Sequence, residues 1–196
     1  MSIRSFVAVD LPDAVKEEVC ALIFSLKRTD AAVRWVAKKN LHLTLKFLGY
    51  INDEQISGTK AFLSKISAGQ NSFTFSLSGL GSFPLSGKPR VVWVGVDEGK
   101  EALENLAEKI EREAARTGFE KEERAFSAHL TVGRVREHAR LPQQADLIQA
   151  IKSAAFSSAH KIKADHLTLY KSTLTGEGAL YEPIEFFNFL SRETIK

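Results

Sequence analysis

The sequence predicts an α+β fold, in which helices and strands are mixed along one chain. Stretches with helical spacing alternate with strand-like stretches, but several neighbouring strands follow one another through short turns. Short turns join antiparallel strands, whereas parallel strands need a long crossover. The mixture therefore favours antiparallel sheets over a doubly wound parallel sheet. No low-complexity segment or proline-rich linker marks a boundary, so residues 1–196 are expected to form a single domain.

The first quarter of the chain reads as a strand, a helix and two more strands. Apolar residues throughout predict a strand at 5–10. Pro12 suits the first turn of a helix that runs to about Lys27, with acidic residues near its positive end. Strands are then expected at 33–36 and 41–48, joined by a polar turn.

The next part of the chain is predicted to hold a helix and two strands separated by a loop. The helix starts at about Asn52 or Asp53 and ends near Ile66. Alternation of polar and apolar residues at 72–77 predicts a half-buried strand. Glycine, serine and proline at 79–89 predict a loop before a strand at 91–96.

The second half contains the clearest helix, at about 100–117, where an apolar stripe ends at a glycine. A strand is expected at 126–135 and a helix from Leu141 to about Ser153. Two final strands, at 164–171 and 179–187, flank a turn that contains two glycines.

The composition is that of an ordinary globular protein, with 44% apolar and 26% charged residues. The net charge of +3 permits an anionic ligand but is too small for a protein that coats nucleic acid. No apolar run approaches the roughly 18 residues of a membrane span, and the amino terminus lacks a signal-peptide layout. The single Cys20 cannot form an internal disulfide. We therefore expect a cytoplasmic protein without membrane contact. The sequence leaves the oligomeric state open, and a monomer is the default expectation.

No metal or other cofactor is expected. The histidines are scattered along the chain, and no paired cysteines or H-x-x-E-H motif is present. The chain also lacks a Walker loop and a glycine-rich dinucleotide motif.

A short repeated motif supplies the candidate catalytic residues. His42-Leu43-Thr44-Leu45 and His129-Leu130-Thr131-Val132 lie 129 − 42 = 87 residues apart. In a strand, residues two apart point to the same side, roughly 7 Å apart, while the residues between them face the core. Each strand therefore offers one imidazole and one hydroxyl to a common surface.

Two such strands suit in-line attack on a phosphodiester. A base takes the proton of the attacking water, and an acid protonates the departing alkoxide from the opposite side of phosphorus. Histidine can serve in both roles near neutral pH. Thr44 and Thr131 could donate hydrogen bonds to the non-bridging oxygens. One copy alone is typical of an incidental histidine, and a third copy, His166-Leu167-Thr168-Leu169, has the same pattern.

The context of the first two copies resembles the motif regions of the 2H phosphoesterases. The match is to their RNA 2′,3′-cyclic phosphodiesterase branch, also called 2′-5′ RNA ligase-like. It is carried by residues 33–36 with 40–49, by residues 126–134, and by segments near both ends of the chain. The segment with His166 is similar to a late family strand that is not catalytic, so this histidine is interpreted as structural.

The resemblance implies two pseudo-symmetric α+β lobes, each an antiparallel sheet with outer helices, around a central cleft. It implies hydrolysis of RNA 2′,3′-cyclic phosphate ends to 2′-phosphomonoesters, without a metal. His42 is expected to act as the general acid and His129 as the general base, and the pair exchanges roles in the reverse 2′-5′ ligation. The partner is an RNA end or oligonucleotide that carries the cyclic phosphate.

Three further residues are candidates for substrate binding. By the resemblance, Arg134 supplies a cation to the phosphate. Lys46 continues the alternation of His42 and Thr44 and is predicted to reach the rim of the cleft. Tyr170 is a candidate stacking surface for a terminal base, although a core role is equally consistent with its context.

Other functions remain open. The same site could act on 2′-5′ oligonucleotides or small nucleotide cyclic phosphates. A protein of a different class would bind an RNA end without turnover. The matched pair of acid and base argues against that class, because binding a phosphate needs cations more than it needs two histidines.

Overall fold

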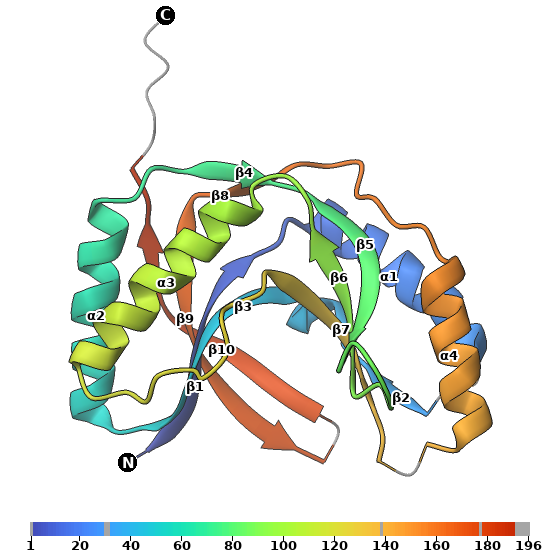
Figure 1. Ribbon diagram of the computed structural model, residues 1–196. Coiled ribbons are helices and arrows are strands. Elements are labelled where there is room, and N and C mark those ends of the chain that lie inside the picture. The colour runs from blue at the N-terminus through green and yellow to red at the C-terminus, as the bar shows by residue number, and fades with distance from the viewer. Residues whose placement is uncertain (1, 30–31, 138, 177, 191–196) are drawn as a thin grey trace, which may run out of the picture.

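The computed structural model describes residues 2–29, 32–137, 139–176 and 178–190. Within them the chain forms two four-stranded antiparallel sheets, each with two helices packed against it (Figure 1). The predicted α+β fold with two sheet-containing lobes is confirmed. No helix of the described residues is long and apolar enough to cross a membrane.

Lobe 1 is the sheet with strand order β10-β9-β1-β3, together with helices α2 and α3. Because β9 pairs antiparallel with both of its neighbours, β1 and β10 run in the same direction on either side of it. The elements of lobe 1 are β1 (Ile3–Asp10), β3 (His42–Ile51), α2 (Asp53–Ala68), α3 (Lys100–Arg116), β9 (His166–Thr175) and β10 (Gly178–Asn188).

Lobe 2 is the sheet with strand order β2-β7-β6-β5, together with helices α1 and α4. Helix α1 packs on α4, which in turn contacts β5 (Figure 1). The elements of lobe 2 are α1 (Asp13–Leu26), β2 (Val33–Trp35), β5 (Leu77–Phe83), β6 (Val91–Val96), β7 (His129–Val135) and α4 (Leu141–Ser153). A small two-stranded sheet pairs β4 (Phe73–Phe75) with β8 (Ile162–Ala164).

The two lobes are interleaved along the chain. After β1 in lobe 1 the chain forms α1 in lobe 2 and returns to lobe 1 for β3. After β6 in lobe 2 it forms α3 in lobe 1 and returns to lobe 2 for β7. Each half of the sequence thus contributes elements to both lobes, and neither lobe is a continuous half of the chain.

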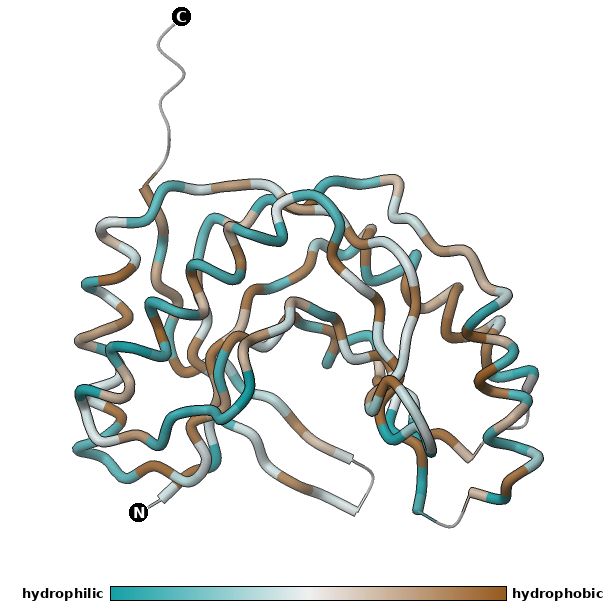
Figure 2. Tube along the Cα trace, viewed as in Figure 1, coloured by the Kyte–Doolittle hydropathy of each residue, from teal (hydrophilic) through white to brown (hydrophobic). Residues whose placement is uncertain are grey.

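Apolar side chains anchor the two strands that carry the His-x-Thr motifs. Leu43 is 0% and Leu45 6% exposed in β3, and Leu130 and Val132 are both 0% exposed in β7. The prediction that these residues face the core is confirmed. Figure 2 shows hydrophobic stretches in the strands of both lobes, so the motif strands rest on core packing.

The segment 72–77 is two strands rather than the single strand predicted. β4 ends at Phe75 in the small sheet, and β5 starts at Leu77 in lobe 2. Strand β5 also continues to Phe83, through residues predicted to be a loop. The glycines there have other roles, because Gly79 (φ 73°) lies where the pairing register shifts and Gly81 leaves room for the Trp93 ring.

The predicted strand at 164–171 is also divided, between β8 and β9, and β9 extends to Thr175. The predicted turn after it includes Glu177, which lies outside the described residues. The four helices start and end within a few residues of their predicted bounds. The polar turn at residues 38–40 is a short 3₁₀ helix (Lys38–Asn40) that links lobe 2 to lobe 1.

Candidate active site

The two motif strands belong to different sheets and contact one another. β3 is an edge strand of lobe 1, and β7 is an inner strand of lobe 2. Residues of β3 lie against residues of β7. The structure thus brings one His-x-Thr pair from each lobe to the junction of the two sheets.

The imidazole of His42 is fixed through both ring nitrogens. Its Nδ1 lies 2.7 Å from the carbonyl oxygen of Asn40, and its Nε2 lies 2.9 Å from Oγ1 of Thr44. Asn40 is itself held, because its side-chain amide donates to the carbonyl of Ala179 at 2.7 Å. The carbonyl that orients His42 is therefore tied to β10.

His129 repeats this arrangement in the other lobe. Its Nδ1 lies 2.7 Å from the carbonyl oxygen of Ser127, again two residues earlier in the chain. A carbonyl only accepts hydrogen bonds, so in both histidines Nδ1 carries the proton and Nε2 is the acceptor in the neutral ring. Thr44 then donates its hydroxyl proton to His42. Both imidazoles are oriented so that Nε2 is the atom that exchanges protons.

Burial favours the neutral form of both rings. It lowers the pKa of His42 to about 4, against the opposing effects of the Asn40 carbonyl and the negative charge of Asp10. Burial also lowers the pKa of His129, and the positive charge of Arg134 adds to this effect. A bound phosphate would favour the protonated form of either ring, because opposite charges stabilise one another.

Aromatic side chains form a wall around His42. The ring of Phe6 stacks on it with centroids 4.7 Å apart and planes 25° apart. Tyr181 meets it edge-on at 5.1 Å. Because these rings exclude water from one side of the imidazole, they account for much of its burial.

His129 has its own pair of aromatic neighbours. Phe83 meets its ring edge-on at 5.1 Å, and Trp93 lies 6.5 Å away. Trp93 can lie flat over β5 because residue 81 is glycine, since a Cβ atom there would come within 2.2 Å of the indole. The two histidines are therefore flanked by different aromatic residues, through one stacked and one edge-on contact at His42 and through two edge-on contacts at His129.

A bulge in β3 changes the direction of Lys46. Consecutive residues of β1 pair with Thr44 and Lys46, so Leu45 is an extra residue and the alternation reverses after it. Lys46 is 4% exposed, and its Nζ lies 2.7 Å from Oε2 of Glu111 in α3. The prediction that Lys46 reaches the rim of a cleft is wrong. Phe47 takes the predicted place beside His42 and Thr44.

A matching bulge in β7 places Arg134. Consecutive residues of β6 pair with Thr131 and Gly133, so Val132 is the extra residue. As a result Arg134 lies on the face of the sheet that carries His129 and Thr131, and it is exposed. The position is consistent with the binding role that the sequence predicts for it.

His166 belongs to a separate cluster around Asp10. One Asp10 oxygen accepts hydrogen bonds from Thr168 Oγ1 at 2.6 Å and His166 Nε2 at 3.1 Å, and the other accepts from Tyr170 at 2.6 Å. His166 Nδ1 also lies 2.8 Å from Asp165. The hydrogen bond to Asp10 is the main reason why the pKa of His166 is raised, with Asp165 adding to it. An imidazole that lies between two carboxylates agrees with the structural interpretation of His166.

Tyr170 is placed by the same cluster. Its hydroxyl is bound to Asp10, and its ring stacks on Phe6 at 5.1 Å. The ring of Phe6 also stacks on the imidazole of His42. Tyr170 therefore packs beside both Phe6 and His42, whose ring centroid lies 6.1 Å from its own, and its role as a stacking surface for a base stays a prediction.

Sequence reasoning missed several residues that shape this site. Phe6 and Asp10 share a face of β1, but the predicted strand at 5–10 is apolar almost throughout, so it did not distinguish its two sides. Tyr181 and Trp93 come from segments far from the motifs in sequence. Only the pairing of strands brings them to the histidines.

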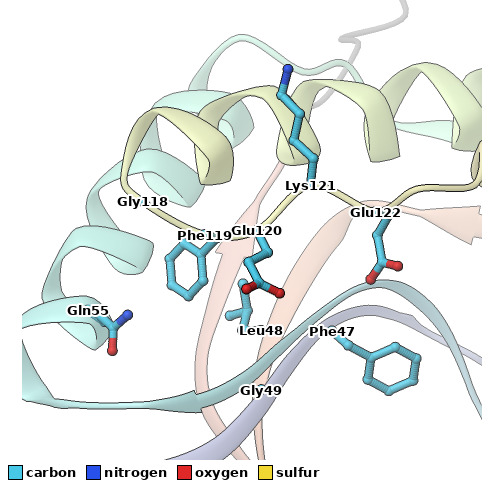
Figure 3. Close-up of a pocket in the computed structure, with 9 residues that line it drawn as sticks. All are labelled: Phe47, Leu48, Gly49, Gln55, Gly118, Phe119, Glu120, Lys121 and Glu122. Atoms are coloured by element: carbon cyan, nitrogen blue, oxygen red, sulfur yellow. The ribbon is translucent and has the colours of Figure 1, made fainter.

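A hollow in the surface lies at the far end of β3, between the start of α2 and the loop after α3 (Figure 3). The motif histidines and threonines do not line it. In Figure 3 the side chains of Glu120 and Glu122 point from the loop after α3 toward β3, and Lys121 points away. Among the described residues, no group of three or more His, Cys, Asp or Glu could hold a metal ion.

Comparisons with known proteins point to one family. A family model described as LigT like phosphoesterase matches residues 9–93 and again residues 94–181, one match for each His-x-Thr motif. An RNA 2′,3′-cyclic phosphodiesterase of Archaeoglobus fulgidus is 35% identical over 94% of this chain and 99% of the relative. A protein of the same name from Thermotoga maritima is 34% identical over 91% of both chains. The crystal structure of E. coli LigT complexed with 3′-AMP has a TM-score of 0.76 and 27% identity, over 96% of this chain and 99% of that one.

Proposed function

From the premise that this chain belongs to the LigT-like phosphoesterases, we propose that it hydrolyses RNA 2′,3′-cyclic phosphate ends to 2′-phosphomonoesters by two-histidine acid–base catalysis. The chain is a phosphodiesterase of the hydrolase class, as its relatives' names indicate. The 3′-AMP in the E. coli neighbour supports a nucleotide as the ligand. The cytoplasmic location and the monomeric state stay predictions.

One observation carries the proposal. Both motif histidines donate Nδ1–H to a main-chain carbonyl two residues earlier, and this leaves Nε2 of each ring for proton transfer. The two rings come from two sheets whose motif strands contact one another. A phosphate held between them would have one imidazole on each side, as in-line displacement requires.

The catalytic steps follow from these positions. Nε2 of His129 takes a proton from the water that attacks phosphorus. Nε2 of His42 gives a proton to the 3′-oxygen as it leaves. With a pKa of about 4, free His42 is mostly neutral at pH 7, so the negative substrate has to stabilise its protonated form. Thr44 and Thr131 contact the non-bridging oxygens, and Arg134 neutralises their charge.

The test is hydrolysis of a short RNA that ends in a 2′,3′-cyclic phosphate, with EDTA present. His42→Ala and His129→Ala are each expected to lower kcat by about 10²- to 10⁴-fold, because each removes a proton-transfer group. His166→Ala, the matched control with the same local motif, retains turnover and the same 2′-phosphate product. Circular dichroism checks that every variant folds. Loss of turnover in folded His166→Ala would show that the catalytic pair is assigned wrongly.

The pH dependence separates catalysis from binding. Both motif histidines have lowered pKa values, so kcat/KM should follow a bell whose maximum lies below the ordinary histidine pKa of about 6.5. A protein that only binds the RNA end would lose affinity steadily as pH rises and would not turn over. A folded wild type without turnover on RNA would favour the smaller cyclic nucleotides or the binding function.

A further inference from the structure

Two arginines face each other across neighbouring strands of lobe 2. Arg34 of β2 is paired directly with Arg134 of β7. The Cβ atoms of directly opposite residues in antiparallel strands lie about 4.5–5.5 Å apart, and like charges in such positions destabilise a sheet. Both side chains are exposed. The pair thus places two positive charges side by side at the surface.

Among the described residues, no acidic side chain is paired with either arginine. Within the described part of the chain, neither guanidinium makes an ion pair or a side-chain hydrogen bond. Some other cations of the protein are paired, such as Lys46 with Glu111 and Arg116 with Glu113. An unneutralised pair of guanidinium groups is suited to an anion with several oxygens, since each group offers a planar fork of donors.

The arginine pair lies on the same face as the catalytic motif of lobe 2. In β6, residues 91, 93 and 95 point the same way, and their partners in β7 are Arg134, Thr131 and His129. Arg34 is the next residue across the sheet from Arg134. The positive charge of Arg134 contributes to the lowered pKa of His129, so Arg134 lies within electrostatic range of that ring. A line of anion-binding groups therefore leads from His129 past Thr131 to the arginine pair.

We propose that Arg34 and Arg134 form a second phosphate subsite, which binds the phosphodiester that links the terminal nucleotide to the rest of the RNA. This inference rests on the proposed function, because it needs a cyclic phosphate bound at the histidines. Arg134 lies between the two phosphates and serves both, whereas Arg34 serves the second alone. The subsite makes the enzyme prefer an oligonucleotide end over a free nucleoside 2′,3′-cyclic phosphate.

The test compares kcat/KM for three substrates. The first is a nucleoside 2′,3′-cyclic phosphate, and the second is a dinucleotide that ends in the same group. The third is that dinucleotide with a neutral methylphosphonate linkage. Arg34→Gln should lower the wild-type preference for the dinucleotide over the mononucleotide by about tenfold, the size expected for a lost charge-assisted contact. With the methylphosphonate linkage, the wild type and Arg34→Gln should show the same, smaller preference.

Two further variants sharpen the experiment. Arg112→Gln removes one positive charge from an exposed position of α3 in lobe 1, and it should leave the preference unchanged. Arg34→Lys keeps the charge without the planar fork and should restore part of the preference. Arg34→Gln is expected to fold, because it removes a repulsive contact rather than a packed one, and its melting temperature checks this.

Other results would overturn the subsite. An equal loss on all three substrates would place Arg34 at the cyclic phosphate itself, and no loss on any would remove it from binding. If the wild type turned over none of them, the proposed function would fail. The subsite would then be judged by whether Arg34→Gln binds the phosphodiester dinucleotide, but not its methylphosphonate form, more weakly than the wild type.

Discussion

The three copies of the same tetrapeptide pattern hold their histidines in two different hydrogen-bonding arrangements. His42 and His129 each bond a main-chain carbonyl through Nδ1, which leaves a neutral ring with Nε2 as acceptor. His166 lies beside a carboxylate at each nitrogen, and these contacts raise its pKa. Contacts that favour the charged form of a ring make it a weaker general base. The hydrogen-bond partner of Nδ1, rather than the motif, distinguishes the copies.

The sequence contains part of that distinction. Asp165 directly precedes His166, whereas Leu41 and Ala128 precede the catalytic candidates. The second carboxylate, Asp10, is 156 residues away and reaches His166 only because β1 pairs with β9. The family resemblance was therefore needed to set His166 aside.

Asp10 is expected to contribute strongly to stability. Burial alone would raise its pKa, but hydrogen bonds from His166, Thr168 and Tyr170 outweigh burial and lower the pKa to about 2. Compared with the ordinary value of 3.8, this shift corresponds to about 2 kcal/mol of stability at neutral pH. Asp10→Asn should lower the free energy of unfolding by up to about this amount in urea titrations at pH 7, since partial solvent exposure weakens the interactions of its charge.

The direction of the pKa shift of Asp10 determines how this stability difference changes with pH. The folded pKa of Asp10 is depressed, so its contribution is present above 3.8 and is lost as pH falls toward 2. The difference between wild type and Asp10→Asn should therefore shrink in acid. Asp146→Asn, at an exposed position of α4, is the control and should change stability by less than about 0.5 kcal/mol. A constant difference across the acid range would show that the Asp10 charge is not the cause.

At the scale of the strand, the matched bulges explain one failed and one consistent prediction. Strict alternation placed Lys46 beside His42 and Thr44, but Leu45 is an extra residue and sends Lys46 to Glu111. Arg134 was predicted from the family motif and not by counting residues. The extra residue Val132 places it on the face of His129 and Thr131. Nothing in Leu45 or Val132 marks a bulge, since both are ordinary apolar strand residues. Bulges of this kind follow from pairing with a neighbouring strand.

Gly133 follows the bulge in β7, and its lack of a side chain lets β2 pack closely. A Cβ atom at this position would come within 2.7 Å of Val33 and 2.9 Å of the Trp35 ring. Gly133→Ala should therefore lower the free energy of unfolding by about 1–3 kcal/mol, the usual cost of overpacking. Thermal or urea unfolding measures the change.

Gly58→Ala provides the matched control. Gly58 lies within α2, and no atom lies within 4 Å of an added Cβ. Because alanine favours a helix over glycine, this variant should gain about 0.5–1 kcal/mol. If both variants were destabilised equally, close packing at Gly133 would not be the reason.

At the scale of the whole molecule, the positions of helices and strands along the chain were predictable, but their grouping was not. Turn and periodicity patterns located the four helices within a few residues. The strand order β10-β9-β1-β3 joins strands from both ends of the chain, and local patterns carry no information on such pairing. The two lobes were expected from the family resemblance alone, and the exchange of α1 and α3 between them was not foreseen.

Because each lobe needs segments from both halves of the sequence, neither lobe should unfold alone. Calorimetry is expected to show a single transition whose calorimetric and van't Hoff enthalpies agree. The prediction that the chain is one domain depends on this result. Two separable transitions would mean that the lobes are independent in spite of their interleaved chain.

The parallel course of β1 and β10 has a mechanical consequence. The chain enters β1 at Ile3 and leaves β10 at Asn188, so a force applied at these two points pulls the strands in opposite directions along their axes. The hydrogen bonds that β9 makes to both neighbours then bear the force in shear and must break together, instead of opening one at a time. No tension reaches lobe 2 until the sheet of lobe 1 separates. Under tension, the His42 side of the site would therefore come apart before the His129 side.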